Sequence, residues 1–221
     1  MTRLVENVGW LFSPTRKVVD MRVTGMNPQE KALFYQSWNK WFFWIDVILG
    51  TLLSLSLVPT LPFLGCWLIL ILPWSRCNEI SYAFYKDILD RLEHKDPESS
   101  LTASDRIRLA MKSYFGLVVN FAVFYYFFPI EGKFEPHLAT FFDAIYFSGV
   151  TITTLGYGDI QPHQWSIKLA ALYEAFLGIL FVAVVVATYM SALANEQVSD
   201  HEFSTSQIDT QQGPKSDGTD P

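Results

Sequence analysis

Residues 151–159 read T-I-T-T-L-G-Y-G-D and lie between two long apolar segments of the chain. Gly156 and Gly158 lack Cβ and alternate with residues whose side chains can point away from a common axis. Glycine adopts positive φ as readily as negative φ, so this backbone can aim successive carbonyl oxygens to one side. A tight glycine turn after a helix would explain the two glycines but not the other residues of this stretch. The threonines, the tyrosine and the apolar flanks favour a strand that coordinates a bare cation, with several copies in a ring.

Residues 154–159, T-L-G-Y-G-D, resemble the selectivity filter of potassium channels. The K⁺-coordinating atoms that this resemblance implies are backbone carbonyls, those of Thr154, Leu155, Gly156 and Tyr157. The Thr154 hydroxyl joins them, and Gly158 completes the motif. The resemblance also implies a homotetramer around one axis and passive conduction, with K⁺ as the permeant ion and no cofactor. Leucine at 155 replaces the commoner valine, which should tune rigidity because the coordinating atom is a backbone oxygen.

The segments around the motif predict an all-α membrane fold in which residues 103–194 form a potassium-channel pore domain. A capping box at 102–105 precedes an apolar helix over 107–128, about 33 Å long and sufficient to cross a bilayer. A second capping box, at 140–143, opens a helix over 141–153 that is too short to span. Its negative C-terminal end leads into the motif and favours a cation there. With a second full span over 168–193, these elements resemble the family's outer, pore and inner helices.

Two acidic residues need partners near the motif. Some family members place a glutamate four residues before the first filter threonine, and Val150 stands at that position here. Asp159 must therefore be held by another group, and Tyr146, in the position of a family tryptophan, is the best candidate. Glu174 lies in a span otherwise free of acids, where an ionised carboxylate is costly unless it meets water or a donor. We expect Glu174 behind the filter, hydrogen-bonded to the pore helix at Tyr146 or Ser148.

Gly178 lies in the interior of the second span, twenty residues after Gly158. Family channels commonly carry a gating-hinge glycine at this offset, and a glycine inside a helix costs about 1 kcal/mol relative to alanine. Close packing of the span against a neighbouring helix would explain the same residue. The sequence leaves both the gating hinge and the close packing open.

The N-terminal half predicts a membrane hairpin between two polar segments. Residues 1–40 mix apolar and basic side chains, typical of a cytoplasmic or interfacial segment, and a helix should begin at Pro28. Residues 41–74 are apolar, and basic residues on both flanks require an even number of crossings. We therefore expect a tight helical hairpin that bends at 58–62, with a shallow re-entrant hairpin as the alternative. Residues 75–102 predict a cytoplasmic amphipathic helix and a linker.

Asp46 lies inside the expected hairpin, and an ionisable residue in a membrane segment is by default a functional candidate. It is only about two helical turns from Lys40, close enough to the membrane interface to be hydrated. The sequence therefore favours a structural role for Asp46.

Half of the 221 residues are apolar and only 17% are charged, as expected for a membrane protein. The net charge of −6 arises largely in residues 195–221, which we expect to be a disordered, acidic, cytoplasmic tail. Nothing indicates a nucleic-acid partner. Cys66 and Cys77 suggest neither a disulfide framework nor a metal site. We expect a multi-pass protein of the plasma membrane, in contact with lipid, with both termini cytoplasmic.

The function that these patterns favour is a K⁺-selective channel. The alternative is a weakly selective or non-conducting pore-like subunit that regulates a partner channel. An enzyme is disfavoured, because no metal-ligand cluster or nucleophile triad is visible. No helix carries the repeated arginines of a voltage sensor. His137 and His163 lie near the expected external mouth and could titrate near neutrality, although lone loop histidines usually have no such role.

Overall fold

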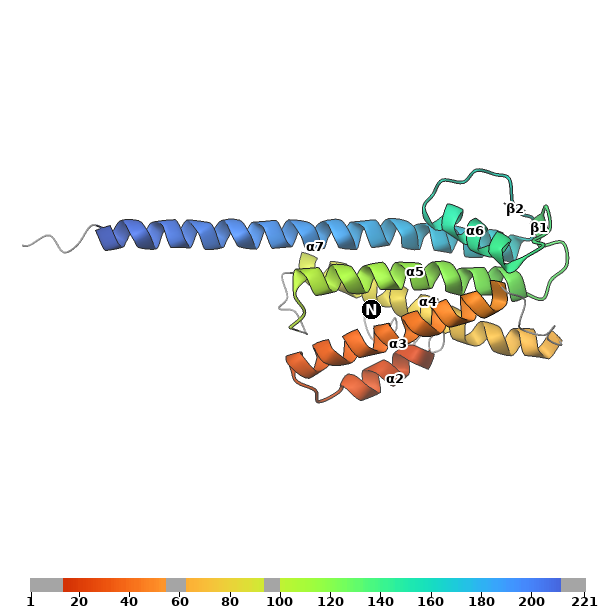
Figure 1. Ribbon diagram of the computed structural model, residues 1–221, viewed down its shortest axis with the longest axis horizontal. Helices are drawn as coiled ribbons and strands as arrows, with labels where there is room; N and C mark the ends of the chain where they lie inside the picture. Colours follow the sequence, from red (N-terminus) through yellow and green to blue (C-terminus); the bar gives the residue numbers. More distant parts are fainter. Residues whose placement is uncertain (1–13, 55–62, 94–99, 212–221) are drawn as a thin grey trace, which may run out of the picture.

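The computed structural model describes residues 14–54, 63–93 and 100–211 of the chain. Its elements are, in order, α2 (Pro14–Val23), α3 (Pro28–Ser54), α4 (Phe63–Leu92), α5 (Ala103–Phe127), β1 (Phe134–Glu135), α6 (Phe141–Ile152), β2 (Gln161–Pro162) and α7 (Trp165–Gln211). Strands β1 and β2 form one short antiparallel pair, with Phe134 opposite Pro162. The prediction of an all-α fold with a short helix before the glycine motif is confirmed (Figure 1).

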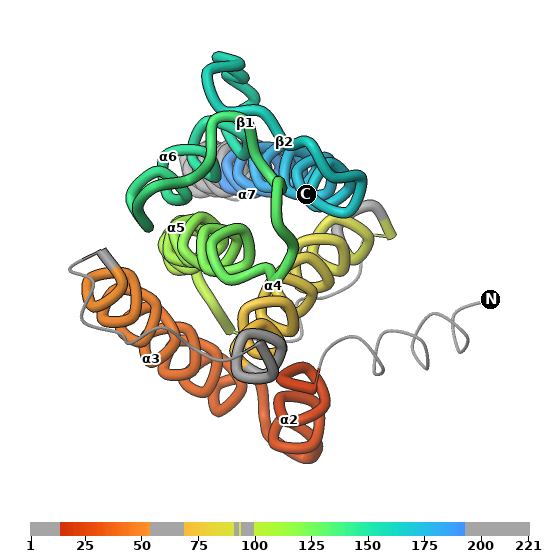
Figure 2. The backbone as a smooth tube through the Cα atoms, turned by 90° about the vertical axis from the view of Figure 1, so that its right-hand side faces the viewer, coloured from red at the N-terminus to blue at the C-terminus, as the bar shows by residue number. Residues whose placement is uncertain are grey.

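Helix α5 lies at the centre of the bundle, with α3, α4, α6 and α7 packed around it (Figure 2). Its buried side chains include Leu117, Phe121, Ala122 and Tyr125, all fully removed from solvent. Burial of such large apolar side chains stabilises each by about 1.5–3 kcal/mol relative to exposure. Because α5 contacts both the N-terminal helices and the glycine-motif region, one core joins the two halves of the chain.

The predicted helix starts are confirmed, and in each case a local cap explains them. Asn27 Oδ1 accepts a hydrogen bond from the Glu30 amide at 2.8 Å, and the Asn27 amide donates one to Glu30 Oε2 at 3.0 Å. Thr102 caps α5 by accepting from the Asp105 amide. Residues 140–143 form a full capping box at the start of α6. Since a cap satisfies amides that the first helical turn leaves unpaired, these starts are determined by residues three apart.

Helix α4 corrects the predicted boundary at residue 75. The chain does not begin a separate amphipathic helix there, because α4 continues through Pro73 to Leu92. Leu70, Cys77 and Ile80 form a buried stripe that spans Pro73, so packing on both sides holds the helix together. The predicted bend at 58–62 lies outside the described residues. Whether both hairpin arms cross a membrane stays a prediction.

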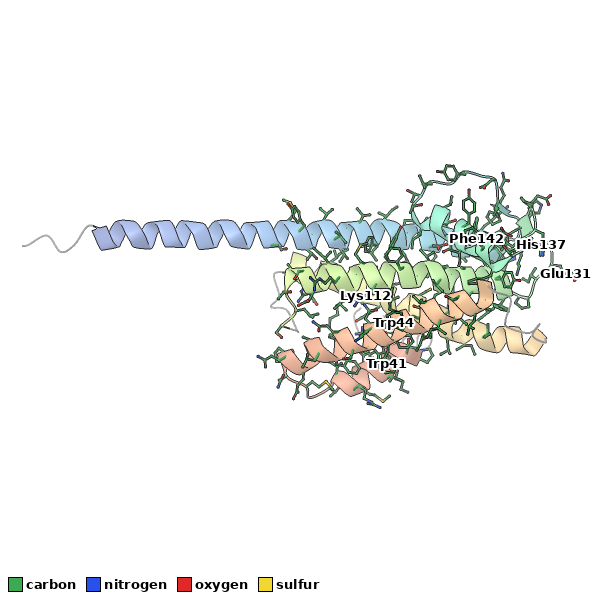
Figure 3. The ribbon with its side chains drawn as sticks, in the orientation of Figure 1. Trp41, Trp44, Lys112, Glu131, His137 and Phe142 are labelled. Atoms are coloured by element: carbon green, nitrogen blue, oxygen red, sulfur yellow. The ribbon has the colours of Figure 1, made fainter. Side chains whose placement is uncertain are left out.

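Trp41 and Trp44 lie on the outward face of α3, 72% and 53% exposed (Figure 3). Among the described residues, two helical stretches are long and apolar enough to cross a membrane: Ala103–Phe127 and Trp165–Ala192. These are the two spans that the sequence predicted for the pore domain.

Helix α7 is longer than predicted. It extends to Gln211 and projects beyond the rest of the bundle (Figure 1). The expectation of disorder over 195–221 is therefore wrong for 195–211, whereas 212–221 lie outside the described residues. The physical reason is the absence of helix breakers: no glycine or proline occurs between Gly178 and Gly213.

Candidate functional site

Residues 153–159, here called the glycine motif, follow α6 directly, and the backbone of this motif alternates in handedness. Thr154, Gly156 and Gly158 have φ values of 58°, 55° and 78°, and they are separated by residues with negative φ. Positive φ is uncommon for a residue with a side chain, so Thr154 marks a backbone held in place by its surroundings. This alternation is the means by which a strand can turn successive carbonyls toward one side.

Backbone amides of the motif are bonded to the end of α6. The Thr154 amide donates to the Thr151 carbonyl at 2.9 Å, and the Leu155 amide donates to the Val150 carbonyl at 3.0 Å. These bonds use carbonyls that the helix end leaves unpaired. The motif is thus fastened to the C-terminus of α6, the negative end of the helix dipole.

Asp159, the acid after the motif, accepts a 2.7 Å hydrogen bond from the phenol of Tyr146 on α6. This is the partner expected from the sequence in the absence of an acid at Val150. The hydrogen bond to Asp159 raises the pKa of the Tyr146 phenol, because ionised tyrosine could not donate it. Gln161 adds a second clamp by donating to the Gly158 carbonyl at 2.9 Å. The sequence did not indicate this role for Gln161.

Glu174 is fully buried behind α6 and binds two hydroxyls. Ser148 of α6 donates to Oε1, as expected from the sequence, and Tyr125 of α5 donates to Oε2 at 2.7 Å. Tyr146 is not a partner, since it is engaged with Asp159. Sequence reasoning missed Tyr125, because it lies in an aromatic-rich stretch that carries no signal distinguishing it from its neighbours.

Gly178 packs against the last turn of α6. A Cβ built at this position would lie 1.9 Å from the Ile152 carbonyl oxygen, far inside any real contact. Helix α7 continues without interruption through this residue. The structure therefore shows the close packing that the sequence left open, and a gating hinge at Gly178 stays a prediction.

Lys133 organises the loop at this end of the bundle. Its side chain is 7% exposed, and Nζ donates to the carbonyls of Tyr126 and Phe128 at 2.6 and 2.9 Å. A buried cation here lies at the C-terminal end of α5, the negative end of the helix dipole. Sequence analysis did not single out Lys133. His137 and Glu131 lie exposed on the same loop region (Figure 3), and His163 is also exposed.

Asp46 differs from the expectation of a hydrated side chain. It is 6% exposed and accepts a 3.0 Å hydrogen bond from Asn120 of α5. The close approach is possible because Gly116 faces it: a Cβ at 116 would lie 2.8 Å from Asp46 Oδ2. Asp46 therefore has a structural role, as predicted, but it joins α3 to α5 by a buried hydrogen bond and is not hydrated.

Two membrane-length helices that flank a half-length helix and an alternating glycine strand define the pore domain of a membrane channel. A family model described as "Ion channel" matches residues 113–195. This part of the chain is therefore similar to a family of ion channels. No solved structure matches the chain.

Curated relatives share the same region. The chain is 33% identical over 67 residues to a "Hyperpolarization-activated voltage-gated potassium channel" of Methanocaldococcus jannaschii, covering 30% of this chain and 31% of the relative. It is 42% identical over 55 residues to "Two pore potassium channel a" of Oryza sativa subsp. japonica, covering 25% and 16%. It is 28% identical over 88 residues to human "Potassium voltage-gated channel subfamily KQT member 4", covering 40% and 13%. The chain thus spans less than a third of the length of these relatives.

Proposed function

We propose that the protein is the subunit of a K⁺-selective channel that conducts passively through a pore built from four copies of the chain. The observation that carries this proposal is the backbone of the glycine motif, with positive φ at Thr154, Gly156 and Gly158. In such a strand the carbonyls of residues 154–157, with the Thr154 hydroxyl, would replace the water shell of K⁺. The names of the relatives, all potassium channels, support the choice of ion.

The tetramer is needed because one chain supplies one such strand, whereas dehydrated K⁺ must be surrounded. Apolar side chains left exposed by the single chain support this association. Leu155 and Tyr157 of the motif are 60% and 67% exposed. On α7 one series of large apolar residues is more than half exposed: Leu169, Leu172, Phe176, Ile179, Val182, Val186, Tyr189 and Met190. Neighbouring subunits and lipid would cover these residues.

Two hydrogen-bonded pairs of side chains would brace the motif without touching the ion. Tyr146 holds Asp159 at the outer end, and Glu174 holds α6 from behind through Ser148. Because α6 also points its C-terminus at the motif, four copies would direct their negative dipole ends toward the pore axis. We place the motif toward the outside of the plasma membrane and both termini in the cytoplasm, which the basic residues on both flanks of 41–74 favour.

Flux through liposomes that contain the purified protein tests the function. We expect K⁺ efflux with Na⁺ excluded, and a particle mass of four chains in detergent. Gly156→Ala should abolish flux while the tetramer persists, because alanine is strained at a φ of 55°. Gly50→Ala is the matched control, since its Cβ would meet only ordinary contacts at 3.5 Å or more. A wild-type tetramer that passes Na⁺ and K⁺ equally, or neither ion, would contradict the proposal.

A further inference from the structure

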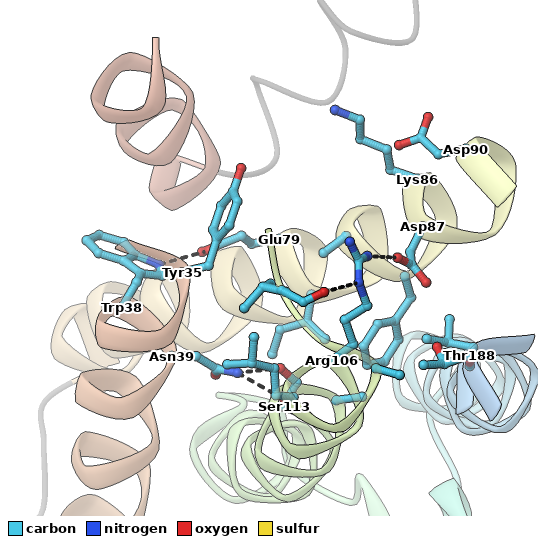
Figure 4. Close-up of a pocket in the computed structure, with 18 of the residues that line it drawn as sticks. Tyr35, Trp38, Asn39, Glu79, Lys86, Asp87, Asp90, Arg106, Ser113 and Thr188 are labelled. Carbon is cyan, nitrogen blue, oxygen red and sulfur yellow. Dashed lines mark hydrogen bonds and ion pairs between the residues drawn. The ribbon is translucent and has the colours of Figure 1, made fainter. Parts of the chain in front are cut away.

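A cavity of about 650 Å³ lies between α3, α4, α5 and α7, at the end of the bundle remote from α6. Figure 4 shows Trp38 and Asn39 of α3, Glu79 of α4, Ser113 of α5 and Thr188 of α7 around it. Its volume falls within the range of roughly 300–1,000 Å³ that is usual for small-molecule sites. The pore function proposed above does not use this cavity.

One wall of the cavity carries a buried ion pair whose hydrogen bonds are incomplete. Arg76 and Glu79 are 5% and 6% exposed, and Arg76 Nη1 donates to Glu79 Oε1 at 2.7 Å. Trp38 Nε1 donates to the same carboxylate oxygen at 3.0 Å, and Asn39 Oδ1 accepts from Arg76 Nη2. Among the described residues, Arg76 Nε and Glu79 Oε2 find no hydrogen-bond partner. Arg76 and Glu79 both line the cavity, and this pair is left with one unsatisfied donor and one unsatisfied acceptor, which is costly for buried groups.

The rest of the lining argues against an ionic ligand. Basic and acidic residues are nearly balanced, with Arg106 paired to Asp87 at 2.9 Å. Apolar walls come from Ile80, Phe84 and Val184. A ligand that fits these features has an apolar body and an uncharged polar head that both accepts and donates a hydrogen bond. A hydroxyl does both through one oxygen, and a primary amide does both through adjacent atoms.

We propose that this cavity is a binding site for an uncharged amphiphile with a hydroxyl or amide head, held at Arg76 and Glu79. Helix α7 lines the cavity at Val184 and Thr188, beyond the packing contact of Gly178 with α6. A bound amphiphile stabilises the arrangement of α4 against α7 that forms the cavity, and so changes the population of conducting channels. This last effect rests on the proposed channel function, whereas binding itself does not.

Photolabelling of the full-length protein in liposomes with a diazirine-bearing octanol tests the binding, with adducts located by mass spectrometry. We expect saturable adducts on cavity-lining residues that excess 1-octanol removes. Octane and octanoate should each compete at least about tenfold more weakly than 1-octanol. Octane cannot form hydrogen bonds to the charged pair, and octanoate must lose the hydration of its charge. Adducts only on lipid-facing residues, no saturable adducts, or equal competition by octane would overturn the proposal.

Two variants sharpen the test. Ala83 lines the cavity but is itself exposed, so Ala83→Phe should fill part of the space without disturbing the core and should abolish saturable labelling. Ala139→Phe, on the exposed loop at the opposite end, should label like the wild type. K⁺ flux with and without 1-octanol is measured separately. If the protein is labelled in the cavity but never conducts, the binding site is supported and the proposed channel function is contradicted. If it conducts but shows no saturable labelling, only the binding site is contradicted.

Discussion

The phenol of Tyr125 on α5 donates a 2.7 Å hydrogen bond to Glu174 on α7, and neither side chain is exposed to solvent. The same carboxyl group accepts from Ser148 on α6. Three helices of the pore domain therefore meet at one buried acid. Because buried polar groups are costly when they lose a partner, this contact fixes the position of α6 and, through it, of the glycine motif.

Replacing Glu174 with alanine should lower the free energy of unfolding by about 1–3 kcal/mol, because the buried Tyr125 hydroxyl loses its acceptor. Glu174→Gln should have a smaller effect, since the amide oxygen can still accept. We also expect both variants to inactivate faster during sustained K⁺ flux. Thermal unfolding and flux decay measure the two effects, with the exposed Glu131→Gln as the control. Wild-type melting and flux decay in Glu174→Ala would refute the bracing role.

Gly178→Ala should be among the most disruptive single substitutions in α7. The new methyl group would meet the Ile152 carbonyl at 1.9 Å, so α6 or α7 must move. Overpacking of this kind costs about 1–3 kcal/mol or more. We expect a lower melting temperature and loss of K⁺ over Na⁺ discrimination, because the glycine motif begins directly after Ile152. Gly50→Ala provides the comparison, and a Gly178→Ala protein as stable as that control would exclude the packing role.

Tyr146→Phe removes the hydrogen bond to Asp159 without changing the ring. We expect faster decay of K⁺ flux and little change in melting temperature, since Tyr146 is only partly buried in the single chain. Tyr85→Phe, on the exposed face of α4, should behave as the wild type. If Tyr146→Phe and Tyr85→Phe decayed at the same rate, the clamp on Asp159 would have no functional role.

Alkaline pH tests the same hydrogen bond in the wild type. The pKa of Tyr146 is raised above its ordinary value of 10.0, so its contribution is complete below pH 10 and is lost as the pH rises past the shifted value. Flux decay should therefore be the same at about pH 7 and about pH 9, where a phenol stays protonated. A clear acceleration by pH 9 that is absent in Tyr146→Phe would contradict this assignment.

Lys133→Met should destabilise the loop between α5 and α6. The substitution keeps the apolar stem but removes the donors to the Tyr126 and Phe128 carbonyls, which costs about 1–3 kcal/mol. Hydrogen exchange of the amides at 126–138 should increase while that of α7 stays the same. Lys168→Met, at an exposed position, should leave both regions unchanged. Unchanged exchange at 126–138 in Lys133→Met would show that this lysine does not hold the loop.

Much of the pore domain could be predicted because its signals are local. The capping residues at 102–105 and 140–143 set the starts of α5 and α6, and the glycines set where positive φ is allowed. The end of α7 and the continuity of α4 were predicted less well. In α4, buried side chains on both sides of Pro73 outweigh the local preference to break the helix.

The sequence by itself determined the order of the helices and the resemblance of residues 154–159 to a selectivity filter, since each depends on neighbouring residues; that residues 154–157 coordinate a cation stays a prediction. Only the tertiary structure decided which partners meet. Tyr125 and Glu174 are 49 residues apart, and Asp46 and Asn120 are 74 apart. The packing of Gly178 on Ile152 and the cavity beside Arg76 have the same origin. Each arises where faces of separate helices come together, and the spacing of residues within one helix does not specify which face it will meet.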